Sequence, residues 1–117
     1  MNRYKQLLGA KGERLALQFL RQKGYSIIRR NFSCPFGEID IIARQGKATV
    51  FIEVKTRTSC NFGLPQEVIG AEKIKHLLRS AQFYIKRYAH SDGEFRFDIV
   101  SIILGERTQI DLIKNVF

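Results

Sequence analysis

The stretch 37-GEIDIIARQGKATVFIEVKTR-57 decides the fold, because it predicts two β-strands joined by a two-residue turn. The Gly-Lys pair at 46–47 suits a hairpin turn that requires glycine in its first position. β-Branched and aromatic residues fill both flanks, as strands prefer. Asp40, Glu53 and Lys55 interrupt these flanks, although a buried strand excludes charged side chains unless they are paired. Their presence needs a physical reason.

The turn also fixes which residues face each other across the hairpin. With the turn at 46–47, the numbers of opposed residues add up to 93, so that Asp40 faces Glu53. Glu38 faces Lys55 by the same rule, and side chains alternate between the two faces of a strand. The four charged residues then share one face. The other face is expected to hold Ile39, Ile41, Val50, Ile52 and Val54, unless a β-bulge shifts the register.

Two carboxylates that face each other on neighbouring strands have Cβ atoms about 5 Å apart and repel each other. Three arrangements remove the repulsion: a shared proton, a cationic neighbour such as Lys55, or a bridging divalent cation. Mg²⁺ and Mn²⁺ prefer oxygen ligands and are commonly held by one or two carboxylates together with waters and phosphate. Such an ion can activate water against a phosphodiester, and Lys55 can orient that water or neutralise the developing charge. The alternative is a solvated sheet face that carries surface salt bridges.

Hydropathy patterns over the whole chain predict five strands and two helices. Gly9 and Gly12 in the first helix each cost about 1 kcal/mol relative to alanine, which suggests a close approach of that helix to the sheet. Strands are expected at 25–32, 36–44, 48–56, 94–104 and 108–117, and helices at 3–23 and 71–89. The order α-β-β-β-α-β-β without a linker predicts one α/β domain over residues 1–117, with a single mixed β-sheet of about five strands flanked by helices.

The composition narrows the class of partner. Lysine and arginine number 20 against 11 acidic residues, which gives a net charge of +9 and a pI near 9.9. A domain this basic attracts polyanions, above all nucleic acid, although the charge also serves solubility. Cys34 and Cys60 lack CxxC spacing and His76 and His90 are isolated, which argues against a zinc site and a disulfide framework. No apolar run is long enough to span a membrane, so a soluble, cytoplasmic protein with no membrane partner is expected.

Several motifs resemble known families. Asp40, twelve further residues and then Glu53-Val54-Lys55 resemble the PD-(D/E)xK nuclease signature, with Ile39 in place of its proline. More narrowly, the chain resembles the YraN-type family of uncharacterised bacterial proteins in GERLALQFL, RNFSCPFGEIDIIA, VFIEVKTR, the Phe-Gly pair at 62–63 and RFDIVSI. This resemblance covers nearly the whole chain and implies a restriction-endonuclease-like fold, similar to that of archaeal Holliday-junction resolvases.

The resemblance implies a metal-dependent endonuclease that hydrolyses DNA phosphodiester bonds, with branched or structured DNA as substrate and a homodimer as the assembly. Asp40 and Glu53 would bind Mg²⁺ or Mn²⁺ together with the backbone carbonyl of Val54. Lys55 would be the catalytic lysine. Glu13 would be an accessory acid beside the metal or, alternatively, a solvated helix residue. Two other functions stay open: a non-catalytic nucleic-acid-binding module, and a nuclease-fold subunit of a DNA-processing complex.

Further polar residues are expected to have lesser roles around this site. Glu38 and Gln66 would support it, although a solvated position is the alternative for Gln66. Asp98 interrupts an apolar strand and is expected to be structural, paired with Arg96 or with another arginine near the site. Contacts to DNA phosphates would give salt-sensitive binding without sequence preference. The candidates for such contacts are Arg29, Arg30, Arg57, Lys73 and Lys75.

Overall fold

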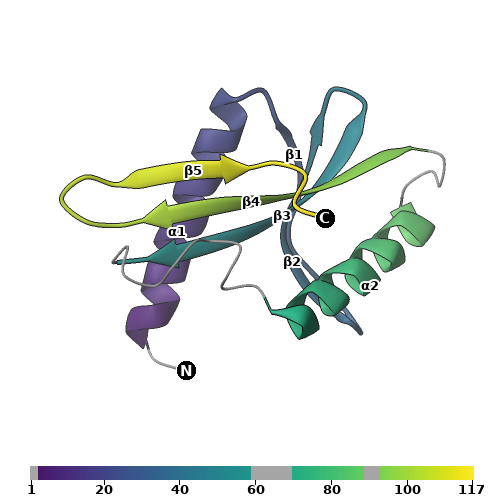
Figure 1. Ribbon diagram of the computed structural model, residues 1–117, viewed down its shortest axis with the longest axis horizontal. Coiled ribbons are helices and arrows are strands. Elements are labelled where there is room, and N and C mark those ends of the chain that lie inside the picture. The colour runs from purple at the N-terminus through teal and green to yellow at the C-terminus, as the bar shows by residue number, and fades with distance from the viewer. Residues whose placement is uncertain (1–2, 59–69, 89–92) are drawn as a thin grey trace.

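The computed structural model describes residues 3–58, 70–88 and 93–117, and its elements follow the predicted order (Figure 1). Their bounds are α1 Arg3–Gln22, β1 Ser26–Cys34, β2 Gly37–Gln45, β3 Ala48–Arg57, α2 Ala71–Tyr88, β4 Glu94–Ile103 and β5 Gln109–Ile113. The prediction differs most at the C-terminus, where the strand expected to reach residue 117 ends at Ile113. Two residues later Asn115 adopts a φ of 56°, a left-handed conformation that cannot continue a strand.

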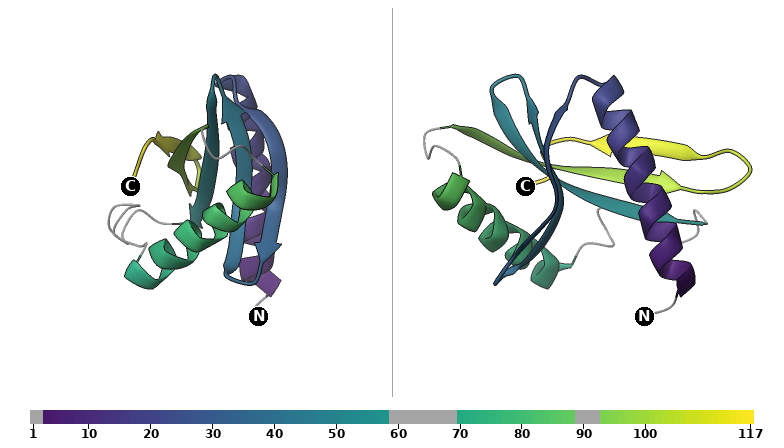
Figure 2. Two further views of the ribbon diagram at one scale, coloured as in Figure 1. Left: turned by 90° about the vertical axis from the view of Figure 1, so that its right-hand side faces the viewer. Right: turned by 180° about the vertical axis from the view of Figure 1, so that it is seen from behind.

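The five strands form one mixed sheet in the order β1-β2-β3-β4-β5. Neighbouring strands are antiparallel except β3 and β4, which are parallel. Parallel neighbours require a crossover connection, and α2 lies in that crossover. Helix α1 covers one face of the sheet and α2 the other, so that the sheet is the middle of three layers (Figure 2). The predicted α/β class and element order are confirmed.

Each helix encloses its own apolar cluster against the sheet. The cluster on the α1 side includes Ala16, Leu17, Leu20, Ile41, Val50, Ile52 and Val100. The cluster on the α2 side includes Phe32, Ile39, Ile42, Phe51, Leu77, Ala81 and Tyr84. Strands covered on both faces read as near-continuous apolar runs. That is why the charged residues within β2 and β3 stand out in the sequence.

Helix α1 approaches β3 closely at Gly12. A Cβ atom at Gly12 would overlap the side chain of Thr56, so that this contact needs a residue without a side chain. The expected close approach is therefore confirmed at Gly12. It is wrong at Gly9, where a Cβ atom would meet nothing within 4 Å. The contact holds the N-terminal half of α1 beside the end of β3.

The hairpin that joins β2 and β3 has the predicted turn and register. Gly46 has a φ of 59°, as the first position of such a turn requires. Five opposed pairs have residue numbers that add up to 93, and they are Ile41–Ile52, Ile42–Phe51, Ala43–Val50, Arg44–Thr49 and Gln45–Ala48. The turn chemistry read from the sequence therefore predicted how the two strands pair near the turn.

The same ladder ends earlier than predicted. Asp40 does not pair with Glu53, and Glu38 does not pair with Lys55. The backbone N–H of Val54 donates instead to the Asp40 side chain, with 2.8 Å between Val54 N and Asp40 Oδ2. A side chain has replaced the backbone acceptor, and beyond this point β3 continues its pairing with β4. Strands β2 and β3 thus separate at the charged residues.

Side-chain alternation along β2 breaks at the same place. Ile41 packs on the α1 side, whereas Ile39 packs on the α2 side. On the neighbouring strand Asn31 adopts a φ of 52°, between the pairs that Arg30 and Phe32 form with β2. A left-handed residue interrupts the regular pleat. The prediction that Ile39 and Ile41 lie on the same face of the sheet is therefore wrong.

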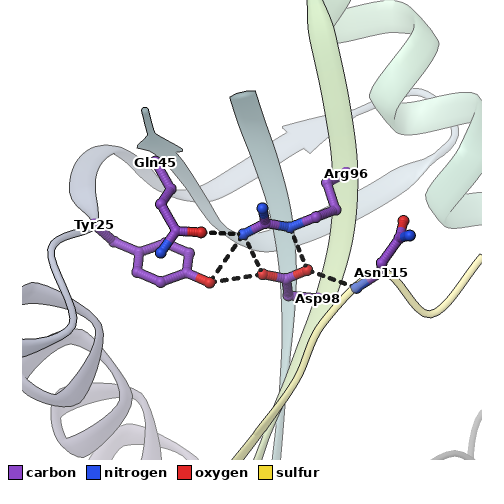
Figure 3. Close-up of polar contacts among 5 residues, drawn as sticks. All are labelled: Tyr25, Gln45, Arg96, Asp98 and Asn115. Carbon is purple, nitrogen blue, oxygen red and sulfur yellow. Dashed lines mark hydrogen bonds and ion pairs between the residues drawn. The ribbon is translucent and has the colours of Figure 1, made fainter. Parts of the chain in front are cut away.

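A buried polar network connects the start of β1, the hairpin, β4 and the C-terminal segment (Figure 3). Its centre is Asp98, which is 1% exposed. Arg96 donates two hydrogen bonds of 2.9 Å to the carboxylate, and Tyr25 Oη donates one of 2.9 Å. The backbone N–H of Asn115 donates another at 3.0 Å, and Arg96 also donates to Gln45. The structural role predicted for Asp98 and its pairing with Arg96 are confirmed.

Candidate functional site

The separation of β2 from β3 opens a cavity of about 440 Å³ beside α1. It is lined by Leu8, Gly9, Glu13, Asp40, Val54, Lys55 and Thr56. Glu13 comes from α1, Asp40 from β2 and Lys55 from β3. The fold therefore brings three of the residues predicted to be catalytic to one cavity, because the hairpin opens where α1 is held against the sheet.

Glu53, the fourth predicted catalytic residue, is buried and does not line this cavity. Its Oε1 lies 3.5 Å from Lys73 Nζ in the first turn of α2. Its Oε2 is buried and has no hydrogen-bond donor among the described residues, and a hydrogen bond between Glu53 and Asp40 requires that one of the two acids be protonated. Buried polar atoms are nearly always paired. When both acids are ionised, Oε2 therefore lacks a partner, and a cation can take the place of the proton.

Burial, and after it the negative charge of Asp40, raise the pKa of Glu53 to about 7. The positive charges of Lys73 and Lys55 act in the opposite direction. Burial removes water, Asp40 repels a second negative charge, and a hydrogen bond between the two side chains requires a proton, so that all three effects disfavour the ionised carboxylate. The two acids thus interact strongly although they are not paired in the ladder. At neutral pH Glu53 is divided between its protonated and ionised forms.

The Val54 backbone faces the same gap as Asp40. The N–H and C=O of one strand residue point to the same side of the strand, and the N–H of Val54 already bonds Asp40 Oδ2. The carbonyl of Val54 is therefore directed into the gap between β2 and β3. Together with the carboxylates of Asp40 and Glu53 it supplies oxygen donors of the kind that Mg²⁺ and Mn²⁺ prefer.

Glu13 lines the cavity but is held by β1. Asn31 Nδ2 donates to Glu13 Oε1 at 3.1 Å, and Arg30 Nε lies 3.5 Å from the same oxygen. Within the described ranges, no group of three or more His, Cys, Asp or Glu side chains is placed to hold a metal ion. Glu13 is therefore not assembled with Asp40 and Glu53 into a set of three ligands. A metal site in this geometry would use two carboxylates.

The other predicted site residues are dispersed. Glu38 Oε1 accepts a hydrogen bond of 3.2 Å from Ser33 and lies outside the cavity lining. Lys75 is exposed on α2, and Arg57 is half-buried at the end of β3. Gln66 lies outside the described residues. Glu38 was expected to support the site because it would face Lys55 across the hairpin. The β2–β3 ladder ends before that pair, so this contact does not form.

Two structural features of this region were not predicted from the sequence. Lys73 was expected at a DNA phosphate, yet its ammonium group pairs with Glu53, a contact that arises only when the first turn of α2 packs against β3. Arg29 and Arg30 were expected to contact DNA, but not to line a groove together with Arg87 of α2. The only sequence signal for the groove is the run of basic and aromatic residues at the end of α2.

Residues 12–102 match the model of a family described as "Uncharacterised protein family UPF0102". This chain belongs to the UPF0102 family. The match confirms the resemblance to YraN-type proteins, and the matched segment contains Glu13, Asp40, Glu53 and Lys55. The family's description names no activity, so the function of a UPF0102 protein has to be argued from its site.

UPF0102 relatives from several bacteria match over nearly the full length. The protein from Caldicellulosiruptor saccharolyticus is 44% identical over 116 residues, covering 97% of this chain and 98% of the relative. The protein from Geobacter metallireducens is 42% identical over 118 residues, covering 100% of this chain and 97% of the relative. That from Nocardia farcinica is 44% identical, covering 97% of this chain and 91% of the relative.

Among the described helices of this UPF0102 chain, none is long and apolar enough to cross a membrane.

Proposed function

We propose that this protein is a metal-dependent endonuclease that hydrolyses DNA phosphodiester bonds, with branched or otherwise structured DNA as its substrate. The observation that carries the proposal is the buried carboxylate of Glu53, which has an oxygen without a partner and lies close to the carboxylate of Asp40. A buried acid that interacts with a second, half-buried acid lowers the stability of a fold. Buried acids with a raised pKa, such as Glu53, cluster at functional sites.

The donor set fits Mg²⁺ or Mn²⁺, because the carboxylates of Asp40 and Glu53 and the carbonyl of Val54 are all oxygen ligands. When bound, such an ion supplies Lewis acidity for phosphodiester hydrolysis. Lys73 is 44% exposed, so its side chain can turn into solvent once Glu53 is neutralised by a divalent cation. Binding would favour the ionised form of Glu53 and release protons near neutral pH.

The remaining residues act on the substrate or position the acids. Lys55 lines the cavity with Asp40, where its ammonium group binds the scissile phosphate and neutralises charge that develops during hydrolysis. Asp40 bonds the Val54 N–H and so fixes the spacing of β2 and β3 at the site. Glu13, held by its contacts to β1, forms the wall of the cavity on the α1 side. The net charge of +9 draws DNA to this surface.

A nucleic-acid-binding module without turnover is the second candidate function. In its favour, an internal cation, Lys73, already compensates part of the charge of Glu53, and the described residues contain no group of three metal-binding side chains. Such a protein would bind phosphates through its basic surface. Its acids would then serve only to position neighbouring strands and helices.

Cleavage assays with purified protein separate the two functions. Duplex, single-stranded and four-way-junction DNA are each incubated with Mg²⁺, Mn²⁺ or EDTA. The nuclease proposal expects cleavage only with metal, and a loss of at least about 100-fold in each of Asp40→Asn, Glu53→Gln and Lys55→Ala. The expected order of substrates places the four-way junction above the plain duplex.

Matched variants of exposed residues control for general effects of charge. Asp111→Asn, Glu106→Gln and Lys114→Ala change the same chemical groups outside the cavity, and they should retain full activity. Binding of DNA in EDTA without cleavage in either metal, unchanged in the three site variants, would instead establish the binding module. Cleavage that survives in Glu53→Gln would remove the basis of the nuclease proposal.

A further inference from the structure

A second hollow, of about 590 Å³, lies between β1 and the C-terminal half of α2, and we refer to it as the β1–α2 groove. It is lined by Arg29, Arg30, Asn31, Phe32, Ser33, Cys34, Pro35, Phe83, Arg87 and Tyr88. Three of these residues are arginines, three are aromatic, and the described lining includes no acidic residue. The groove therefore combines positive charge with flat apolar surfaces.

Two of the three arginines of the groove, Arg29 and Arg87, lie over aromatic rings. The guanidinium carbon of Arg29 lies 4.1 Å from the centre of the Tyr88 ring and 5.7 Å from that of Phe32. The guanidinium carbon of Arg87 lies 5.8 Å from the Phe83 ring centre. Such contacts hold a guanidinium group in a fixed orientation while its charge stays available. Edge-to-face packing of Tyr88 on Phe32 supports the same surface.

The charges of the groove are largely free to bind a ligand. Arg29, Arg87 and Tyr88 are exposed, and within the described residues neither Arg29 nor Arg87 lies in an ion pair with a carboxylate. Exposed, unpaired arginines attract anions, and planar guanidinium groups pair well with phosphates. The groove is thus equipped for a ligand that carries phosphates.

The β1–α2 groove is connected to the candidate active site. Arg30 and Asn31 line the groove, and both contact the carboxylate of Glu13. Glu13 in turn lines the cavity that contains Asp40. One strand of nucleic acid could therefore follow the edge strand β1 from the groove to the cavity.

We propose that the β1–α2 groove binds an unpaired DNA strand that continues into the cavity with Asp40 and Lys55. This inference rests on the proposed function and specifies which feature of the substrate the protein recognises, namely the unpaired strand. Proteins that bind single strands combine a basic groove with aromatic rings or guanidinium planes on which bases stack. In a duplex the bases are stacked on each other and offer no free face. The stacked surface of Arg29 on Tyr88 thus favours a single-stranded segment beside the cleavage site.

Fluorescence anisotropy in EDTA tests this proposal without any cleavage. The probes are a labelled oligothymidylate and a labelled mixed-sequence duplex of equal length, each titrated at several salt concentrations. We expect tighter binding of the oligothymidylate, weakened about five- to tenfold in Arg29→Ala and in Arg87→Ala, with a salt slope smaller by about 0.7 for each lost phosphate contact. The control is Arg107→Ala in the β4–β5 loop, at the opposite end of the molecule from α2 (Figure 1), with an expected change of less than about twofold.

Arg29→Lys separates stacking from charge, and it carries little risk for folding because the side chain is exposed. It keeps the positive charge but loses the planar group. We expect weaker binding of the oligothymidylate and unchanged binding of the duplex. The proposal would be overturned if Arg29→Lys bound both probes with the same affinity as the unmodified protein. It would also be overturned if the alanine variants lost equal affinity for both probes.

The proposed function and this inference can fail separately. If the groove variants lose single-strand binding but the protein never cleaves DNA in any metal, the nuclease function is wrong and the groove is supported. If the protein cleaves DNA while Arg29→Ala, Arg87→Ala and Arg107→Ala bind the oligothymidylate equally well, the groove proposal is wrong. Preferential binding of the duplex by the unmodified protein also contradicts it.

Discussion

Two buried acids on the parallel strands β3 and β4 lie one register position apart and have opposite surroundings. Asp98 is 1% exposed and accepts hydrogen bonds from Tyr25, Arg96 and the Asn115 backbone. Glu53 is 6% exposed, yet one of its oxygens has a single ion pair at 3.5 Å and the other has no donor among the described residues, so that only a proton or a cation can join it to Asp40. The same fold thus satisfies one acid fully and leaves the other incomplete.

The difference is the physical basis for assigning Asp98 to the stability of the fold and for proposing Glu53 as a site residue. Each missing hydrogen bond to a buried polar group costs about 1–3 kcal/mol, so an acid that is retained only for structure should be fully bonded. Asp98 meets this expectation and ties the C-terminal segment to the start of β1. Glu53 does not, and its neighbour Asp40 raises its pKa instead of stabilising its charge. Departures from otherwise consistent packing are expected at functional sites.

Removal of the satisfied acid should have the largest effect on stability. Asp98→Ala leaves the half-buried Arg96 without its partner, and we expect a loss of about 3–5 kcal/mol in the free energy of unfolding. Urea titration followed by circular dichroism at pH 7 measures this. The control Asp111→Ala, on the exposed side of β5, should change stability by less than about 0.5 kcal/mol. A loss below about 1 kcal/mol for Asp98→Ala would contradict the contrast between the two acids.

Titration of the incomplete acid should make stability depend on pH. Burial and the neighbouring Asp40 raise the pKa of Glu53 from its ordinary value of 4.5 to about 7, so the folded state binds its proton more tightly than the unfolded state does. Stability therefore falls as pH rises from about 4.5 to about 7, by at most about 3 kcal/mol, and the loss is complete above that range.

Comparison of the unmodified protein with Glu53→Gln isolates this effect from other titrating groups. The amide resembles the protonated carboxyl, so the two proteins should have similar stability at pH 5. At pH 8 the variant should be more stable by up to about 3 kcal/mol. Urea unfolding at both pH values measures the difference. If the free energies of unfolding of the two proteins changed with pH in parallel, the surroundings of Glu53 would not destabilise its ionised form.

The sequence predicted the parts of this contrast that depend on local patterns. Periodicity located the strands, the Gly46 turn gave the register of five pairs, and an isolated acid in an apolar strand indicated that Asp98 needs a partner such as Arg96. These features depend on turn chemistry and on alternation within a strand. They required no knowledge of how the helices pack.

The parts that were missed depend on single side chains and on tertiary packing. The ladder ends because Asp40 bonds the N–H of Val54, and alternation cannot distinguish a side-chain acceptor from a backbone acceptor. The reversal of Ile39 accompanies the left-handed Asn31 on the next strand. The pairing of Lys73 with Glu53 requires α2 to dock on β3. For these reasons the sequence predicted that Asp40 and Lys55 lie near each other, but not the arrangement of the strands and helices around them.

Divalent metal should stabilise the protein through the incomplete acid. A ligand that binds only the folded state at tenfold its dissociation constant contributes about 1.4 kcal/mol. We therefore expect Mg²⁺ or Mn²⁺ to raise the melting temperature of the unmodified protein but not that of Asp40→Asn or Glu53→Gln. The variant Asp111→Asn should respond like the unmodified protein. Equal stabilisation of all four proteins would place metal binding elsewhere and leave the contrast between the acids without a functional meaning.

The smallest expected effect concerns the cation that partly compensates Glu53. Lys73→Ala should change stability at pH 8 by less than about 1 kcal/mol, because the lysine is 44% exposed and solvent screens its charge. Its loss should nevertheless raise the pKa of Glu53, since Lys73 lowers it, and so extend the fall in stability to higher pH. In calorimetric titrations with Mn²⁺ the variant should bind more tightly than the unmodified protein, because no internal cation competes for Oε1. Lys75→Ala on the exposed face of the same helix is the matched control, with unchanged binding expected. Weaker Mn²⁺ binding in Lys73→Ala alone would mean that the lysine supports the site and does not compete for it.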